Sequence, residues 1–269
     1  MSDPRSVAET AARAGAEVLL EHAGRVTGLR TKSGSADLVS AADIAAGVAV
    51  VRSVAERLEG ARFVVEEPEV YALAGVTAGT LEDGEVWVID PLDGTTSFVH
   101  GYPCWSVSVA CLRDGMPVAG AVYNVPADEL CSAAAGAGAT CGGAPLLVRG
   151  ASTIEDALLV TGFPYDRGAE LDRQLRIFER LLRPAHDIRR DGSAAVDLCH
   201  VAAGRVDGLW ETSLQAWDMA AGVLIVTEAG GVVTDFEGRP WTAATRDVIA
   251  ANPALHAVLL ETIRVTEGR

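Results

Sequence analysis

Trp87–Gly101 reads WVIDPLDGTTSFVHG and places two carboxylates, Asp90 and Asp93, where an apolar strand ends. The letters EVWVID before the break are rich in β-branched and aromatic residues, which is typical of a buried strand. Pro91 and Gly94 predict a turn directly after it. Two carboxylates at the mouth of a sheet repel each other unless a positive charge lies between them, so this stretch predicts a cation site.

Length and charge restrict the class of protein. The chain has 269 residues, 49% of them hydrophobic, which is enough for one large domain or two small ones. Its 22 Lys and Arg and 37 Asp and Glu residues give a net charge of −15. This charge disfavours nucleic acid and anionic membranes as partners, because both bind positive patches, and it suits a protein that attracts divalent cations.

The N-terminus and the cysteines indicate a cytoplasmic protein. The N-terminal segment predicts an amphipathic helix rather than a signal peptide or an anchor, and no apolar run reaches the roughly 18 residues of a membrane span. Five cysteines are scattered without a CxxC pair: Cys104, Cys111, Cys131, Cys141 and Cys199. We expect them to be reduced and mostly buried thiols. The five histidines form no ligand-spaced pair, which argues against a zinc site.

Helical and strand patterns alternate along the chain. The expected helices cover residues 3–24, 38–59, 168–183, 193–203, 216–229 and 253–264. The expected strands cover residues 62–66, 86–90, 104–113, 117–124, 129–135, 186–190, 206–211, 231–235 and 247–251. We predict one layered α/β domain over 1–269. A soft seam near 145–155 divides it into an antiparallel α+β subdomain of about 1–150 and an α/β subdomain of about 151–269.

Three further acids lie where a strand or helix meets a loop. Glu66 and Glu67 follow the apolar run RFVV, and Asp218 lies in the first turn of the helix expected over 216–229. Each of these acids could instead have a purely structural role. The two glutamates could be solvated loop acids, and Asp218 could stabilise its helix by about 0.3–1 kcal/mol through the helix dipole. Hard oxygen ligands without His or thiolate favour magnesium over zinc.

Two long stretches resemble the signatures of the inositol monophosphatase family: WVIDPLDGTTSFVHGYP and WDMAAGVLIVTEAGGVVTD. SADLVSAAD and FVVEE also fit, in the same order and spacing, and the resemblance covers nearly the whole chain. It implies a layered α-β-α-β-α sandwich of the sugar-phosphatase type. It also implies a magnesium-dependent, lithium-sensitive phosphomonoesterase that forms a homodimer and acts on a small phosphorylated polyol.

The resemblance implies a role for each matching residue. The metal ligands, for two to three Mg²⁺, are Glu66, Asp90, Asp93, Asp218 and the carbonyl of Leu92. Asp90 bridges two metals, Glu66 and Thr95 orient the attacking water, and Asp37 and Asp43 lie near a weaker third metal. The substrate contacts are Asp93, Gly94, Thr95, Gly192, Ser193, Ala194 and Glu211. Ser97, Pro68 and Gln215 depart from the common pattern, but none of them removes a metal ligand.

The sequence leaves several phosphate esters as candidate substrates. The stretch GTTSFVHG resembles the inositol-phosphate branch, whereas Trp105 resembles the histidinol-phosphate branch unless it is only core packing. Glu211 could accept hydrogen bonds from hydroxyls or pair with an amine. Phosphoadenosine phosphate, fructose bisphosphate and a specialised pathway phosphate are further alternatives. A regulatory protein that binds transcription machinery is the non-enzymatic alternative.

Overall fold

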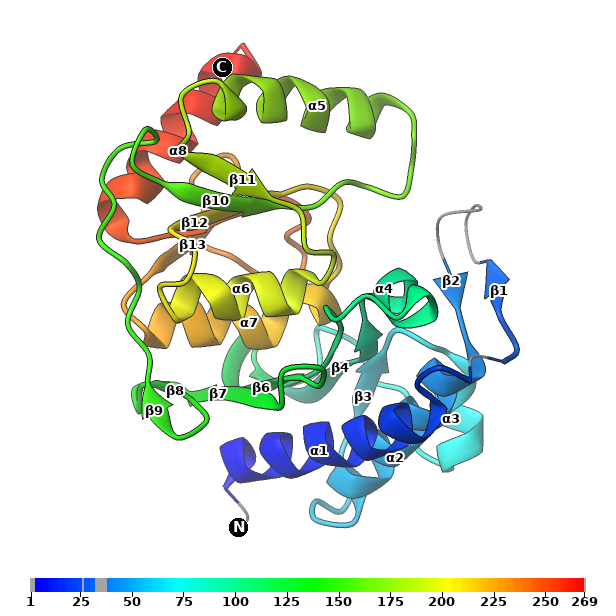
Figure 1. The fold of residues 1–269 in the computed structure, drawn as a ribbon. Helices are drawn as coiled ribbons and strands as arrows, with labels where there is room; N and C mark the ends of the chain where they lie inside the picture. The colour runs from blue at the N-terminus through cyan, green and yellow to red at the C-terminus, as the bar shows by residue number, and fades with distance from the viewer. Residues whose placement is uncertain (1–2, 26, 32–37, 269) are drawn as a thin grey trace.

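Two β-sheets alternate with layers of helices in the structure, which is a computed structural model that describes residues 3–25, 27–31 and 38–268 (Figure 1). From the bottom of Figure 1 upward, the layers are α1 with α2, a seven-stranded sheet, α6 with α7, a five-stranded sheet, and α5 with α8. This order confirms the predicted α-β-α-β-α sandwich. The division into two subdomains stays a prediction.

The helices are α1 (Pro4–His22), α2 (Ala41–Ala55), α3 (Glu69–Ala74), α4 (Thr95–His100), α5 (Ala169–Leu182), α6 (Ala194–Ala202), α7 (Ala216–Glu228) and α8 (Pro253–Thr266). The strands of the larger sheet are β3 (Phe63–Val65), β4 (Glu85–Asp93), β5 (Ser106–Arg113), β6 (Met116–Asn124), β7 (Glu129–Ala134), β8 (Ala139–Cys141) and β9 (Ala144–Pro145). Those of the smaller sheet are β10 (Leu158–Thr161), β11 (Asp187–Arg189), β12 (Gly208–Glu211), β13 (Val232–Thr234) and β14 (Val248–Ala251). The short strands β1 (Arg30–Thr31) and β2 (Leu38–Val39) pair with each other.

The two sheets differ in topology. The larger sheet has the order β3-β4-β5-β6-β7-β8-β9, and all its neighbours are antiparallel except the parallel pair β3 and β4. The smaller sheet has the order β11-β10-β12-β14-β13, with β10 parallel to β11 and β12 and with β14 antiparallel to β12 and β13. The expected antiparallel half and mixed α/β half correspond to these two sheets.

Side chains of β4 alternate between two hydrophobic cores, which explains why its segment 86–89 is apolar throughout. Trp87 and Ile89 pack with α1 and α2 on one face, whereas Val86 and Val88 face α6 and α7 on the other. A third core lies between the smaller sheet, α5 and α8, and Trp210 is its largest side chain. The middle helices α6 and α7 therefore share one core with both sheets.

Several element boundaries differ from the sequence-based expectation. The helix expected over 38–59 begins at Ala41, because Ser40 and Asp43 form a capping box that sets its start. Strand β4 continues past the expected turn to Asp93. The strands β1, β2, β8, β9 and β10 and the helices α3 and α4 are additional to the prediction. Most of these are too short to show a period of their own.

The expectation of five reduced thiols was wrong for two of them. Cys131 and Cys141 form a disulfide, because β7 and β8 pair these two residues directly across the hairpin. The other three cysteines, Cys104, Cys111 and Cys199, are free and buried, as expected. The glycine-rich stretch between β7 and β8 brings the pair together, and residue spacing alone did not reveal it.

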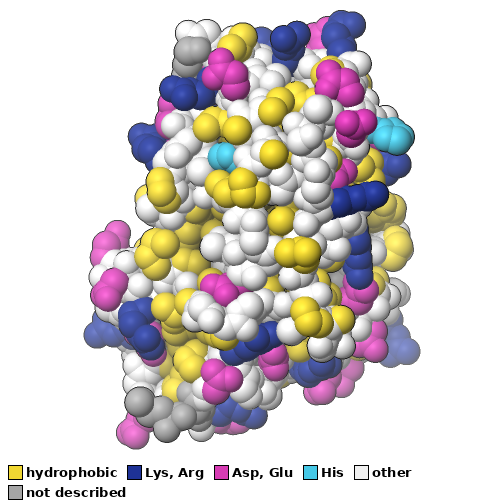
Figure 2. Space-filling model, turned by 90° about the vertical axis from the view of Figure 1, so that its left-hand side faces the viewer, with side chains coloured by type: hydrophobic (Ala, Val, Ile, Leu, Met, Phe, Trp, Pro, Cys, Tyr) yellow, Lys and Arg dark blue, Asp and Glu magenta, His cyan; other side chains and the backbone are white. Residues whose placement is uncertain are grey.

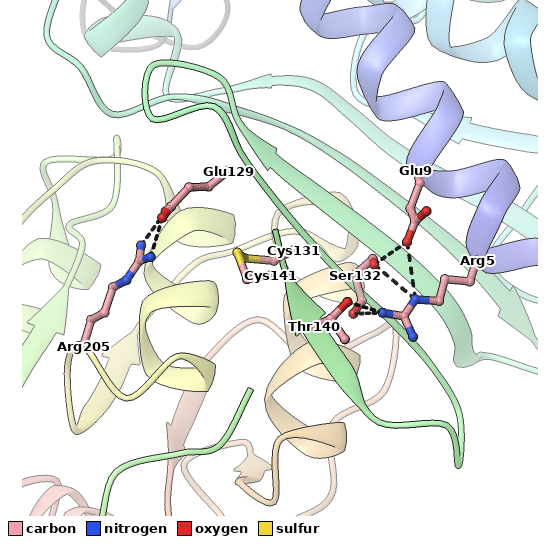
Figure 3. Close-up of a disulfide and its surroundings, with 8 residues drawn as sticks. All are labelled: Arg5, Glu9, Glu129, Cys131, Ser132, Thr140, Cys141 and Arg205. Carbon is pink, nitrogen blue, oxygen red and sulfur yellow. Dashed lines mark hydrogen bonds and ion pairs between the residues drawn. A yellow bond between two sulfur atoms is a disulfide. The ribbon is translucent and has the colours of Figure 1, made fainter. Parts of the chain in front are cut away.

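Polar contacts flank the disulfide on both sides (Figure 3). On one side, Arg5 of α1 donates hydrogen bonds to Ser132 and Thr140, which hold β7 and β8 against the first helix. On the other side, Arg205 forms an ion pair with Glu129 at the start of β7. The hairpin is therefore attached at several points to the lower and middle layers.

The surface shows no concentration of positive charge on the face seen in Figure 2, where basic and acidic side chains lie interspersed. This distribution agrees with the acidic composition of the whole chain. None of the helices in the described part of the chain is long and apolar enough to cross a membrane.

Candidate active site

A pocket of about 590 Å³ receives side chains from both sheets and from the middle helices. Most residues that the sequence assigned to the site line it: Glu66, Asp90, Leu92, Asp93, Gly94, Thr95, Gly192, Ser193, Ala194, Glu211 and Asp218. Asp43 does not line the pocket, but it accepts a hydrogen bond from the hydroxyl group of Thr95, which does. Asp37 lies outside the described residues. Residues 162–166 of the loop before α5 also line the pocket.

A β-bulge brings the two acids of the opening motif to the same pocket. Asp90 pairs with Ser108 and Asp93 pairs with Ser106, so three steps along β4 match two along β5. In a regular strand, side chains three residues apart point to opposite faces of the sheet. The extra residue at the bulge lets Asp90 and Asp93 point to the same face. The amide of Leu92 donates to Asp90 Oδ1 at 3.0 Å and holds that carboxyl group in the bulge.

Asp93 connects β4 to the start of α6. Its Oδ2 atom accepts hydrogen bonds from the Ser193 hydroxyl at 2.6 Å and from the Ala195 amide at 2.8 Å. Burial nevertheless raises the pKa of Asp93 to about 6, against the lowering effect of these two hydrogen bonds. The carboxyl group of Asp93 is thus positioned by a helix N-terminus and still carries an energetic cost when ionised.

Asp218 lies at the third position of α7 and accepts a hydrogen bond from the Gln215 amide at 2.7 Å. The helix-start interpretation of this residue is therefore correct, and the same carboxyl group also lines the pocket. Burial raises the pKa values of Asp90 and Asp218 well above their usual range. The negative charges of Glu66 and Asp93 raise both further, so these four acids repel one another across the pocket.

The Thr95 hydroxyl is held by the start of α2 and by the bulge. It lies 3.0 Å from Asp43 Oδ1 and 3.1 Å from the Leu92 carbonyl oxygen, and it can donate to either. Asp43 is buried because it also caps α2 through Ser40. This chain of contacts fixes the orientation of Thr95 relative to the acids.

Two glycines are required where the backbones of β4 and the α6 loop approach each other. Gly94 has φ +91°, and a Cβ there would lie 2.8 Å from the Cys104 carbonyl oxygen. Gly192 has φ +102°, and a Cβ there would lie 3.3 Å from Ser97 Oγ. Ser97, which departs from the common pattern that the resemblance implied, therefore lies close to Gly192.

Glu211 ends β12 and lines the side of the pocket formed by the smaller sheet. A Cβ at Gly162 would lie only 1.8 Å from Glu211 Oε1, so the glycine makes room for this carboxyl group. Burial raises the pKa of Glu211 to about 8, and the charge of Asp93 adds to the shift. Glu211 is therefore largely protonated at neutral pH.

Sequence reasoning missed several residues of the lining, and two of them, Arg190 and Asp197, are charged. Asp197 is an acid on the otherwise apolar buried helix α6, and this contrast was a signal that could have identified it. Ligand atoms of Asp191, Asp197 and His200 also lie within 4.8 Å of one another, so this group is a candidate cation site beside the pocket. Trp105 packs edge-on against Phe98 in the core, as the structural alternative predicted.

Comparison with known proteins decides the family. The profile of the Inositol monophosphatase family matches residues 1–267. The chain belongs to this family. The family consists of phosphomonoesterases and is typically metal-dependent.

Relatives in the family carry different names. The chain is 40% identical over 263 residues to "Phosphatase IMPL1, chloroplastic" of Arabidopsis thaliana, covering 96% of this chain and 69% of the relative. It is 38% identical over 258 residues to "Inositol-1-monophosphatase" of Synechocystis sp., covering 96% and 87%. It is 37% identical over 263 residues to "Nus factor SuhB" of Pseudomonas aeruginosa, covering 96% and 95%.

Solved structures of the family share the fold over the full length. An extragenic suppressor protein suhB from Bartonella henselae has a TM-score of 0.87 at 36% identity, covering 98% of this chain and 99% of that one. The IMPase of Thermotoga maritima also has a TM-score of 0.87, at 30% identity, covering 98% and 97%. The inositol monophosphatase fold is therefore established for this chain, whereas the relatives' names do not agree on one activity.

Proposed function

We propose that the chain is a magnesium-dependent phosphomonoesterase that hydrolyses a small phosphorylated polyol, with myo-inositol monophosphate as the first candidate. The observation that carries this proposal is the convergence of Glu66, Asp90, Asp93 and Asp218 on one pocket. These acids come from β4, from α7 and from the loop after β3, so only the folded chain brings them together.

The donor set fits Mg²⁺. Carboxylates and the Leu92 carbonyl oxygen are the hard oxygen ligands that this ion prefers. The raised pKa values of Asp90 and Asp218 reflect burial and the repulsion between the acids, and a divalent ion would relieve that repulsion. Bound Mg²⁺ supplies positive charge at the phosphoryl oxygens and lowers the pKa of the attacking water.

The chain's own groups position the reactants. Glu66 and the Thr95 hydroxyl are the pair that we assign to orienting the attacking water, and Asp43 keeps that hydroxyl in place. The Ala195 amide already donates a hydrogen bond to the Asp93 carboxyl group. The amides of Ser193 and Ala194 remain at the N-terminal end of α6. We assign these amides, with those of Gly94 and Thr95, to the phosphate and its adjoining oxygens.

The alcohol part of the substrate is assigned to Glu211 and to the α6 loop from Gly192 to Ala194. The printed name of the Synechocystis relative, Inositol-1-monophosphatase, supports an inositol phosphate. Histidinol phosphate is the alternative, because a carboxyl group at Glu211 could also meet an amine. Lithium inhibition and a homodimer are expected on the same family grounds, and size-exclusion chromatography with light scattering tests the latter.

A regulatory role is the second candidate function. It is favoured by the relative named Nus factor SuhB, which is 37% identical over 96% of this chain. Phosphatase activity and binding to transcription machinery can be tested separately on the same protein. Pull-down of RNA polymerase by wild-type protein and by Asp218→Asn separates the two roles, since only catalysis needs the acid.

Phosphate release tests the proposed function directly. Wild-type protein is assayed with and without Mg²⁺ on myo-inositol 1-phosphate, histidinol phosphate, phosphoadenosine phosphate and fructose 1,6-bisphosphate. Asp218→Asn is the inactive control, with circular dichroism to show that it is folded. We expect magnesium-dependent turnover, a dominant kcat/KM for inositol 1-phosphate, and loss of turnover in the variant by at least about a hundredfold.

Two outcomes would contradict the proposal. Turnover of Asp90→Asn or Asp218→Asn near the wild-type rate would show that these acids do not hold an essential metal. A folded wild-type protein that binds Mg²⁺ but releases no phosphate from any of the four compounds would favour the binding role. A dominant rate on histidinol phosphate would keep the chemistry and replace the substrate.

A further inference from the structure

Asp197 is a buried acid that the proposed chemistry leaves without a role. Its side chain is 1% exposed, lies on α6 one turn beyond Ser193, and lines the pocket. Neither of its oxygens makes a hydrogen bond with any residue that the structure describes, and Oδ1 is completely buried. Because buried polar groups are almost always hydrogen-bonded, this group requires a partner that enters the pocket.

Glu211 has the same character on the facing wall. It is 8% exposed, lines the same pocket, and makes no side-chain hydrogen bond within the described part of the chain. Both side chains line the same pocket, and after burial the charge of Glu211 is the largest influence that raises the pKa of Asp197. Two carboxyl groups that each have a buried oxygen without a hydrogen bond to any described residue therefore line the same pocket.

The protonation of this pair distinguishes between ligands. Burial raises the pKa of Asp197 well above its usual range and that of Glu211 to about 8, so burial favours the neutral form of each group. A neutral carboxyl group donates one hydrogen bond and accepts others, which matches the hydroxyl group of an alcohol. An ammonium group would instead need ionised carboxylates, and it would also face the positive charge of Arg190 at the pocket rim.

We propose that Asp197 is a specificity-determining residue that binds, together with Glu211, two hydroxyl groups of the alcohol part of a phosphorylated polyol. This inference rests on the proposed phosphatase function and names the recognition element of the same site. We assign Asp197 to substrate choice and not to the phosphoryl group, because the proposed metal ligands are other acids that line the pocket: Glu66, Asp90, Asp93 and Asp218.

Asp197→Ala tests this proposal on two substrates, myo-inositol 1-phosphate and p-nitrophenyl phosphate, which lacks hydroxyl groups on its leaving group. We expect kcat/KM for inositol 1-phosphate to fall by about tenfold to a hundredfold, because a site built to hydrogen-bond a hydroxyl loses that interaction. The kcat/KM for p-nitrophenyl phosphate should stay within about threefold of the wild type. Asp197→Asn, which keeps a donor and an acceptor, should restore most of the preference.

Asp191→Ala is the matched control. Asp191 lies six positions earlier, near Asp197 and His200, but does not line the pocket. We expect both substrates to be hydrolysed at wild-type rates by this variant. An equal loss of preference in Asp191→Ala would show that the group of Asp191, Asp197 and His200 binds a cation, and it would overturn the assignment to hydroxyl groups.

Other outcomes also overturn the inference. Equal losses on both substrates in Asp197→Ala and Asp197→Asn would indicate a structural role, and an unchanged rate on inositol 1-phosphate would exclude contact. A wild-type preference for histidinol phosphate that Asp197→Ala removes would indicate recognition of an amine. A folded wild-type protein that hydrolyses neither phosphate would refute the proposed function itself, whereas failure of this inference appears only in the variants.

Discussion

Replacement of Glu211 by glutamine should make the metal-free protein more stable, and by an amount that depends on pH. Burial raises the pKa of Glu211 from 4.5 to about 8. Between these values the unfolded chain releases the proton and the folded chain keeps it, so wild-type stability falls as pH rises through this window. The glutamine side chain would have nearly the same shape as the protonated glutamate and would not ionise in either state.

The size of the effect follows from the two pKa values. At pH 7 the ionisation of the unfolded state costs the wild type about 3 kcal/mol, and at pH 5 it costs about 1 kcal/mol. Glu211→Gln should therefore unfold about 6–12 °C higher than wild type at pH 7 and only about 2–4 °C higher at pH 5. Solvent screens the charge of Glu211 little, because the side chain is only 8% exposed.

Thermal unfolding by calorimetry between pH 5 and pH 8 in the presence of a chelator measures this difference. Glu82→Gln, at an exposed glutamate, is the control and should leave the unfolding temperature unchanged at every pH. A stability difference that does not vary with pH would refute the reasoning, and so would a wild type more stable than Glu211→Gln at pH 7. Either result would mean that Glu211 is ionised in the fold and held by a positive partner.

Three further predictions concern single positions. Gly162→Ala should lower kcat/KM for inositol 1-phosphate by about tenfold to a hundredfold, because the new Cβ would lie 1.8 Å from Glu211 Oε1. Hydrolysis of p-nitrophenyl phosphate should change little, and equal losses on both substrates would contradict this prediction. Arg173→Met should cost about 2–4 kcal/mol in chemical denaturation without changing magnesium activation, because a side chain only 17% exposed loses three acidic partners. Alkylation under denaturing conditions without reductant should label three of the five cysteines, and five labelled cysteines would disprove the disulfide between Cys131 and Cys141. These two residues are 10 positions apart, so removing the disulfide should lower the free energy of unfolding by about 3 kcal/mol.

The parts of the site that the sequence predicted are those where local pattern and chemistry coincide. Asp90 and Asp93 stand out because a buried strand and a proline-glycine turn surround them, and Asp218 stands out at a helix start. The bulge that turns Asp90 and Asp93 toward one pocket was not predictable from the strand alone, because it depends on the register with β5. The convergence of the acids is likewise a tertiary property.

The missed features depend on contacts between distant segments. Asp197 is marked in the sequence only as an acid on a mostly apolar helix, and the pocket that it lines is formed by residues from distant segments, among them Glu211 of β12. The pairing of Cys131 with Cys141 depends on the register of β7 and β8 rather than on a cysteine motif. Strand β10 has four residues, too few for a reliable period. The layered fold was easier to predict because its long apolar helices and strands carry strong periodic signals.

The middle layer of helices lies between the two sheets that contribute acids to the pocket. Helices α6 and α7 pack against both sheets, yet the acids of β4 belong to the lower sheet and Glu211 belongs to the upper one. A small tilt of the upper sheet on these helices would change the separation between the phosphate end and the alcohol end, and it would leave the acids of β4 in place. Substitutions in this apolar layer should therefore change which alcohol the pocket accepts, although they lie away from the acids of β4.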